Sequence, residues 1–98
     1  MTIIEKIIAM SEPHVDGSGS RTVLKSRKYI LSIVGGRQGL YGDFKTDFEL
    51  AIMDPLTNDF ITKLIFPEMN DDVMAYVPAE RVEEIVNMLF PNQSFQES

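Results

Sequence analysis

Glycines with the spacing of a ligand-binding loop are the first feature of this sequence that could carry chemistry. The segment VGGRQGLYG (34–42) holds four of the six glycines within eight residues, and Gly36, Gly39 and Gly42 are spaced by three. Such glycines cradle a phosphate when a helix begins directly after them, because its free N–H groups face the anion. Here residues 47–53, DFELAIM, alternate between polar and apolar and predict a strand. The segment is therefore interpreted as the tip of a hairpin, with a nucleotide-binding loop as the less favoured reading.

Two long side chains at this tip and a lysine just after it are typical of contacts with another molecule. An arginine and an aromatic residue are common anchors of protein interfaces. The first set of candidate partner-binding residues is Arg37, Tyr41 and Lys45.

A basic stretch from residue 21 to 45 suggests a second kind of site. It has six bases and one acid, with Tyr29, Tyr41 and Phe44 between them. Cations contact phosphates and aromatic rings stack on bases, so this stretch is the best candidate for nucleic-acid binding. The candidate residues for this alternative are Lys25, Arg27, Lys28 and Arg37.

Acidic residues dominate the remainder of the chain and suggest the opposite kind of partner. Residues 46–98 carry two bases and eleven acids, which gives this segment a charge of -9 within a chain of net charge -6. Such an asymmetry bears on partners and not on fold. The candidate acidic contacts are Asp71, Asp72, Glu80 and Glu84.

Residues for catalysis or metal binding do not form a recognisable constellation. His14 is the single histidine and there is no cysteine, which excludes a multi-histidine or thiolate zinc site. His14, Asp16, Ser18 and Ser20 have the residue types of a hydrolytic triad, but a Gly/Ser-rich loop is a poor scaffold for fixed geometry. The segment PEMNDD (67–72) lacks the spacing of a calcium loop. We expect no enzymatic activity, no cofactor and no metal.

The elements that position these residues follow from hydrophobic patterning. Thr2 and Glu5 have the spacing of a capping box, and isoleucines at helical spacing follow, so a first helix is expected before Pro13. A second helix is expected from Pro78 to Pro91, with acids in its opening turns. Four strands are predicted between the two helices: 21–34, 47–53, 60–66 and 73–77.

The 98 residues thus predict one domain of the α+β class. Its fold is expected to be a four-stranded antiparallel meander with an N-terminal and a C-terminal helix packed on one face. Residues 11–20 are expected to form a flexible loop, and residues 92–98 a frayed polar tail. The uncovered sheet face, with apolar atoms from Met53, Ile61, Ile65, Met74 and Tyr76, suggests a homodimer.

These observations favour a small acidic interaction protein that binds and regulates or inhibits another macromolecule. A protein partner is expected, with nucleic acid as the alternative. No apolar run reaches the length of a membrane span, and the N-terminal segment lacks the pattern of a signal peptide, so a cytoplasmic location is expected. Small size without cofactor motifs is typical of phage or mobile-element accessory proteins, including counter-defence proteins.

Overall fold

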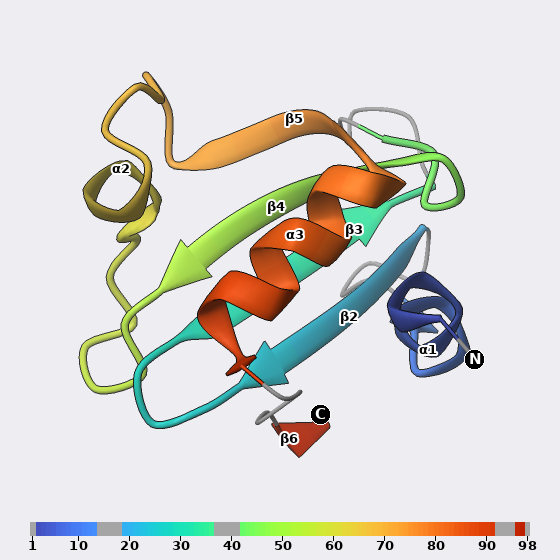
Figure 1. The fold of residues 1–98 in the computed structure, drawn as a ribbon, viewed down its shortest axis with the longest axis horizontal. Helices are drawn as coiled ribbons and strands as arrows, with labels where there is room; N and C mark the ends of the chain where they lie inside the picture. The colour runs from blue at the N-terminus through green and yellow to red at the C-terminus, as the bar shows by residue number, and fades with distance from the viewer. Residues whose placement is uncertain (1, 14–18, 37–41, 92–95, 98) are drawn as a thin grey trace.

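The chain folds into one antiparallel sheet with two helices against it (Figure 1). The computed structural model describes residues 2–13, 19–36, 42–91 and 96–97. Its elements in chain order are α1 (Ile3–Ala9), β1 (Glu12–Pro13), β2 (Ser20–Lys25), β3 (Ile30–Gly35), β4 (Asp47–Met53), α2 (Thr62–Ile65), β5 (Val73–Pro78), α3 (Ala79–Leu89) and β6 (Gln96–Glu97).

Within the described residues the sheet has six strands: five lie in the order β1–β2–β3–β4–β5, and the short β6 also pairs with β2; all pairs are antiparallel. The predicted α+β class, the terminal helices and the strand at 47–53 are confirmed. The predicted number of four strands is wrong, because β1 and β6 add to the sheet. Both lie in segments expected to be a loop and a tail, and two residues are too few to give a hydrophobic pattern.

The predicted single strand over residues 21–34 is a hairpin, formed by β2 and β3. Its turn has no glycine, proline, asparagine or aspartate, so the strongest turn signals are missing and a single serine marks the turn. Instead, the Ser26 hydroxyl accepts hydrogen bonds from the backbone N–H groups of Lys28 and Tyr29, at 3.2 and 3.3 Å. The Ser26 N–H donates to the Tyr29 carbonyl at 2.8 Å and closes the turn.

The predicted strand over residues 60–66 is also wrong, because most of it forms the single helical turn α2. Its apolar residues fit either period, and a short apolar run does not distinguish strand from helix. Thr62 fixes the outcome, since its side chain is fully buried. The Thr62 hydroxyl accepts from the Ile52 N–H at 3.0 Å and donates to the Asp72 carbonyl at 2.7 Å, which ties the end of β4 to the residue before β5.

Both terminal helices contribute to a single core on one face of the sheet. The predicted capping box of α1 is present: Glu5 N–H donates to the Thr2 hydroxyl and Thr2 N–H donates to the Glu5 carboxylate. The second of these bonds is the main reason that the pKa of Glu5 is lowered. The α3 helix lies across the strands in Figure 1. Its buried residues, Val82, Ile85, Val86 and Leu89, share the core with Ile4 and Ile7 of α1.

A buried threonine also ties α1 to the sheet. The Thr22 hydroxyl donates to the Ile7 carbonyl at 2.7 Å, and Thr22 is only 1% exposed. Carbonyls in the last turn of a helix lack intrahelical partners, so this bond satisfies a group that would otherwise be buried without one. Within the described ranges, no helix has the length and apolar character needed to cross a membrane.

Candidate functional site

The glycine segment connects β3 to β4, which pair antiparallel, so the predicted hairpin is confirmed. The Gly36 N–H donates to the Gly42 carbonyl at 3.0 Å and closes the base of the connection. Of the three candidate contacts, Arg37 and Tyr41 lie outside the described residues. Lys45 is exposed in the turn before β4. No helix begins directly after the glycines, and this removes the feature that a phosphate cradle requires.

Asp43 organises the turn in which Lys45 lies. One carboxylate oxygen accepts from the backbone N–H groups of Lys45, Thr46 and Asp47, at 2.8, 2.8 and 3.1 Å. The other accepts from the Thr46 hydroxyl at 2.8 Å. These bonds, with that from the Thr46 N–H as the largest contribution, hold the pKa of Asp43 far below its ordinary value. Asp43 is therefore a structural residue, and the Thr46 carbonyl that it positions accepts from Ala79 N–H at 3.1 Å, where α3 begins.

Three basic candidates lie together in and beside the β2–β3 turn. Lys25 ends β2, and Arg27 and Lys28 follow within the turn that Ser26 closes. All three are exposed. The turn brings together cations that a single long strand would have divided between two faces, while Arg37 lies outside the described residues.

The four acidic candidates lie at the two ends of β5. Asp71 and Asp72 precede the strand, and Glu80 and Glu84 follow it in the first turns of α3. Asp72 lies 3.7 Å from the Lys63 ammonium, and Glu84 lies 3.5 Å from the Arg81 guanidinium. The structure thus brings each pair together and separates the two pairs by the length of the strand.

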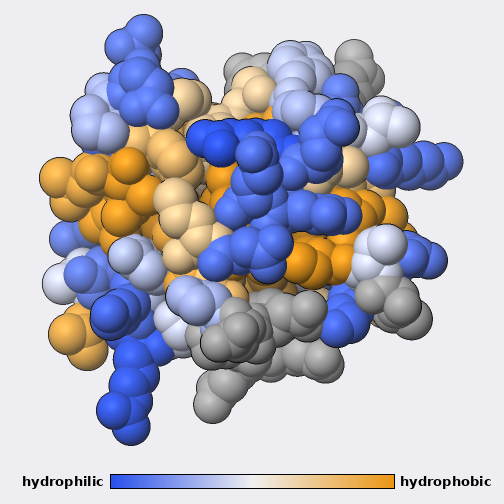
Figure 2. Space-filling view, in the orientation of Figure 1, coloured by the Kyte–Doolittle hydropathy of each residue, from blue (hydrophilic) through white to orange (hydrophobic). Residues whose placement is uncertain are grey.

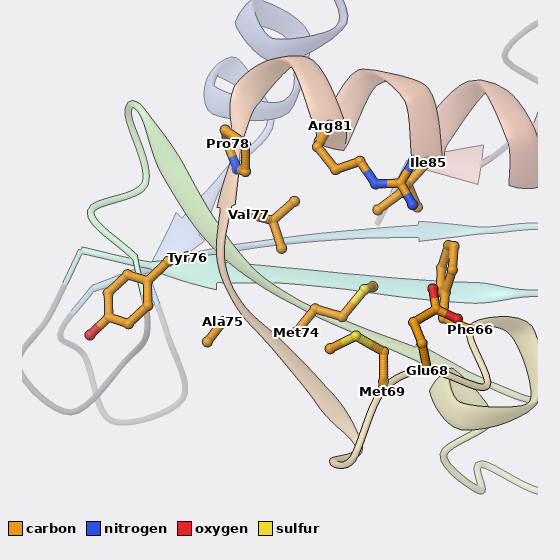
Figure 3. Close-up of a pocket in the computed structure, with 10 residues that line it drawn as sticks. All are labelled: Phe66, Glu68, Met69, Met74, Ala75, Tyr76, Val77, Pro78, Arg81 and Ile85. Carbon is orange, nitrogen blue, oxygen red and sulfur yellow. The ribbon is translucent and has the colours of Figure 1, made fainter.

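An apolar groove of about 220 Å³ lies between β5, α3 and the segment after α2 (Figure 3). Phe66 and Met69 line it from that segment, Met74 and Val77 from β5, and Arg81 and Ile85 from α3. The Arg81 guanidinium lies 5.5 Å from the centre of the Phe66 ring, within the range of a cation–π contact. The groove is the concave apolar surface that a partner side chain could enter.

The chain segment that contributes the groove is acidic, although the charged side chains in the lining itself are one acid, Glu68, and one base, Arg81. Residues 66–85 contain six acids and one base, Arg81, for a net charge of -5. Glu68 lines the groove directly, and Figure 3 shows it beside Phe66. Figure 2 shows hydrophilic side chains along α3, with apolar surface on both sides of it. An apolar hollow with acidic residues at both ends of the adjacent strand favours a ligand that is apolar and positively charged.

Sequence patterns did not indicate the groove, because its residues come from three separate segments. Met74 and Tyr76 were expected on the same uncovered face of the sheet. Instead Met74 is 6% exposed and faces the helices, whereas Tyr76 is 61% exposed. The cause is an irregularity: Phe48 pairs with Val77 but Leu50 pairs with Met74, so β5 has one extra residue. Tyr76 adopts a positive φ of 51° in this bulge.

The sheet face away from the helices carries a row of small side chains, Val23, Ser32, Ala51 and Val73, on four successive strands. Arg21 and Lys25 extend along β2 on the same face, and Glu49 lies on β4. Self-association through this face stays a prediction.

Two hypotheses about site chemistry, metal binding and hydrolysis, concern side chains of which only a part belongs to the described residues. Among these residues, no three histidine, aspartate or glutamate side chains converge as metal ligands. Of the four residues with hydrolytic side-chain types, His14, Asp16 and Ser18 lie outside the described ranges. Comparisons with protein-family models, with curated proteins and with solved structures found no match.

Proposed function

We propose that this chain is a non-enzymatic interaction protein that regulates or inhibits a partner protein by binding a positively charged segment of it. The observation that carries the proposal is the apolar groove between β5 and α3, with acidic residues at both ends of the strand. Apolar contact supplies affinity in such an interface, while complementary charge speeds association and selects the partner. This surface combines the acidic candidates Asp71, Asp72, Glu80 and Glu84 with a hollow that can take an anchoring side chain.

The test is capture of a partner from the native host by the wild-type chain and by two matched methionine variants. Met69→Glu places a charge in the groove, whereas Met88→Glu places the same charge on the exposed side of α3, where Met88 is 52% exposed. We expect Met69→Glu to lose the captured protein and Met88→Glu to retain it, with melting curves showing that both are folded. Equal capture by the two folded variants would refute binding at the groove.

Nucleic-acid binding is a second candidate function, favoured by the three exposed cations in and beside the β2–β3 turn. Phosphate contacts make such binding steeply dependent on salt. A gel-shift titration with duplex and single-stranded probes at low and moderate salt tests it. A variant with Lys25, Arg27 and Lys28 changed to glutamine is expected to lose the shift, and absence of binding by the wild-type chain at low salt would exclude this function.

A further inference from the structure

The outer side of β5 is an open edge of the sheet. The open edge is the side of Val73–Pro78 that faces away from β4. Within the described ranges β4 is the only strand that pairs with β5. In Figure 1 no other helix or strand of the described residues runs along this side. An edge strand presents backbone N–H and C=O groups that can pair with an added strand.

Hydrogen bonds at both ends of β4 define which β5 groups point outward. Ala79 N–H donates to the Thr46 carbonyl. The Ile52 N–H donates to the Thr62 hydroxyl, and the Ile52 carbonyl accepts from the Ile61 N–H. Because hydrogen-bonded pairs alternate along an antiparallel ladder, Leu50–Met74 is such a pair. The backbone groups of Val73 and Ala75 therefore point away from β4.

Only a short part of the open edge can accept a strand. The bulge at Tyr76 breaks the regular spacing, and Pro78 has no N–H to donate. Val73 and Ala75 remain, and together they offer two donors and two acceptors. These are the main-chain bonds of a short strand addition, the recognition mode in which backbone pairing gives affinity and alternate side chains give specificity.

The groove lies where the central side chain of an added strand would point. Met74 lies between Val73 and Ala75, and its side chain lines the groove. Residues directly opposite each other in a sheet project to the same face, so the residue opposite Met74 would enter the groove beside Met69. Its neighbours two positions away project to the same face, about 7 Å along the strand, towards the acidic residues at the two ends of β5.

We propose that the open edge and the groove together bind an extended segment of a partner protein, with an apolar residue at its centre and a lysine or arginine two positions to each side. The segment forms a short β-bridge to Val73 and Ala75, its apolar side chain occupies the groove, and its cations lie near Glu68 and Glu80. The pattern is symmetric and so fits either strand direction. This inference rests on the proposed function and specifies its ligand.

The probe is a nine-residue peptide with blocked termini that has a central leucine, lysines two positions to each side, and threonines elsewhere. Titration of the isotope-labelled full chain by NMR is expected to shift the amide signals of Val73 and Ala75 and to protect both amides from hydrogen exchange. A peptide with glutamates in place of the lysines is expected to bind at least tenfold more weakly. Absence of shifts at millimolar peptide, or equal binding of both peptides, would overturn the proposal.

Two sets of variants separate backbone pairing from charge. Ala75→Pro removes one outward donor and should weaken the peptide at least tenfold. A peptide N-methylated on the amides that face β5 makes the same test if this variant fails to fold. The double change Glu68→Gln and Glu80→Gln should weaken binding at least fivefold, whereas the matched change Glu12→Gln and Asp59→Asn, at exposed positions outside the groove, should leave it unchanged.

The outcomes also separate this inference from the function on which it rests. If Ala75→Pro still captures the host partner while Met69→Glu does not, the groove binds a partner but strand addition is wrong. If neither variant affects capture, both proposals fail. Sedimentation of the wild-type chain tests whether a second copy of this chain occupies the open edge. A dimer that Ala75→Pro dissociates would mean that the chain binds itself there and not a partner segment.

Discussion

The two edges of the sheet differ in whether further strands of the chain pair with them. At the β2 edge, β1 pairs with Ser20 and Arg21, and β6 pairs with Leu24 and Lys25. At the β5 edge, no strand from the described ranges adds to the sheet. The covered edge carries basic residues and the open edge is flanked by acidic ones.

This difference indicates that the open edge is a specific feature of the fold. Native sheets generally protect their edges from unwanted pairing, and this chain covers one edge with short strands from segments near both termini. On the other side the bulge and Pro78 limit pairing to a few residues, which opposes uncontrolled aggregation while it leaves Val73 and Ala75 accessible. An edge strand that can pair over only a few residues, and that no other strand of the described residues covers, suits the binding of one short extended segment.

The largest expected effect concerns the threonine that holds the start of β5. Thr62→Val keeps the shape of the side chain but removes the partner of both the Ile52 N–H and the Asp72 carbonyl. Each unsatisfied buried group costs about 1–3 kcal/mol, so we expect the free energy of unfolding to fall by about 3 kcal/mol. Urea unfolding measures it, and the exposed Thr57→Val serves as control. Hydrogen exchange should show that β5 amides lose more protection than β2 amides. An equal loss of protection in both strands would contradict the role of Thr62 in holding β5.

The corresponding threonine at the covered edge should matter less. Thr22→Val leaves one group without its partner, the Ile7 carbonyl, and should cost about 1.5 kcal/mol in the same urea experiment. Because β2 has strands on both sides, its amides should stay protected. A loss as large as that of Thr62→Val would contradict the expected difference between the two edges.

Part of the fold and of the candidate site could be predicted from the sequence, and the remainder could not, for physical reasons. The strand at 47–53 and both terminal helices have clear periodicity, the capping box marks the start of α1, and prolines mark both ends of α3. The strands β1 and β6 are too short to have a period, and the Ser26 turn uses a hydroxyl in place of the usual turn residues. The acidic candidates could be named from charge, but the groove between them depends on a bulge at Tyr76, which shifts Met74 relative to Tyr76 in a way that strict alternation does not allow.

A third prediction concerns pH and the far end of the open edge, where the Asp43 turn positions Thr46 against Ala79. The lowered pKa of Asp43 means that its carboxylate stabilises the fold at pH values above its ordinary pKa of 3.8, and that this contribution is lost as the pH falls below that value. Asp43→Asn should therefore be less stable than the wild type at pH 7, and the difference should shrink between pH 4 and about 2. Urea unfolding across this range measures it. Glu5 titrates in both proteins and cancels, so a difference independent of pH would contradict this role of Asp43.

The smallest expected effect separates two cations beside the open edge. Arg81 lies over the Phe66 ring as well as 3.5 Å from Glu84. Among the described residues, Lys63 has only its pair with Asp72, at 3.7 Å, whose side chains are 56% and 46% exposed. Arg81→Gln should cost about 0.7 kcal/mol, because the guanidinium and its stem cover the ring, and Lys63→Gln should cost less than about 0.5 kcal/mol. Raising the salt to about 0.5 M should remove the Lys63 effect by screening and preserve most of the Arg81 effect, since packing on the ring does not depend on counterions. If salt removes both effects equally, Arg81 acts only as a surface charge, and the groove has no fixed wall on the α3 side for a partner side chain to meet.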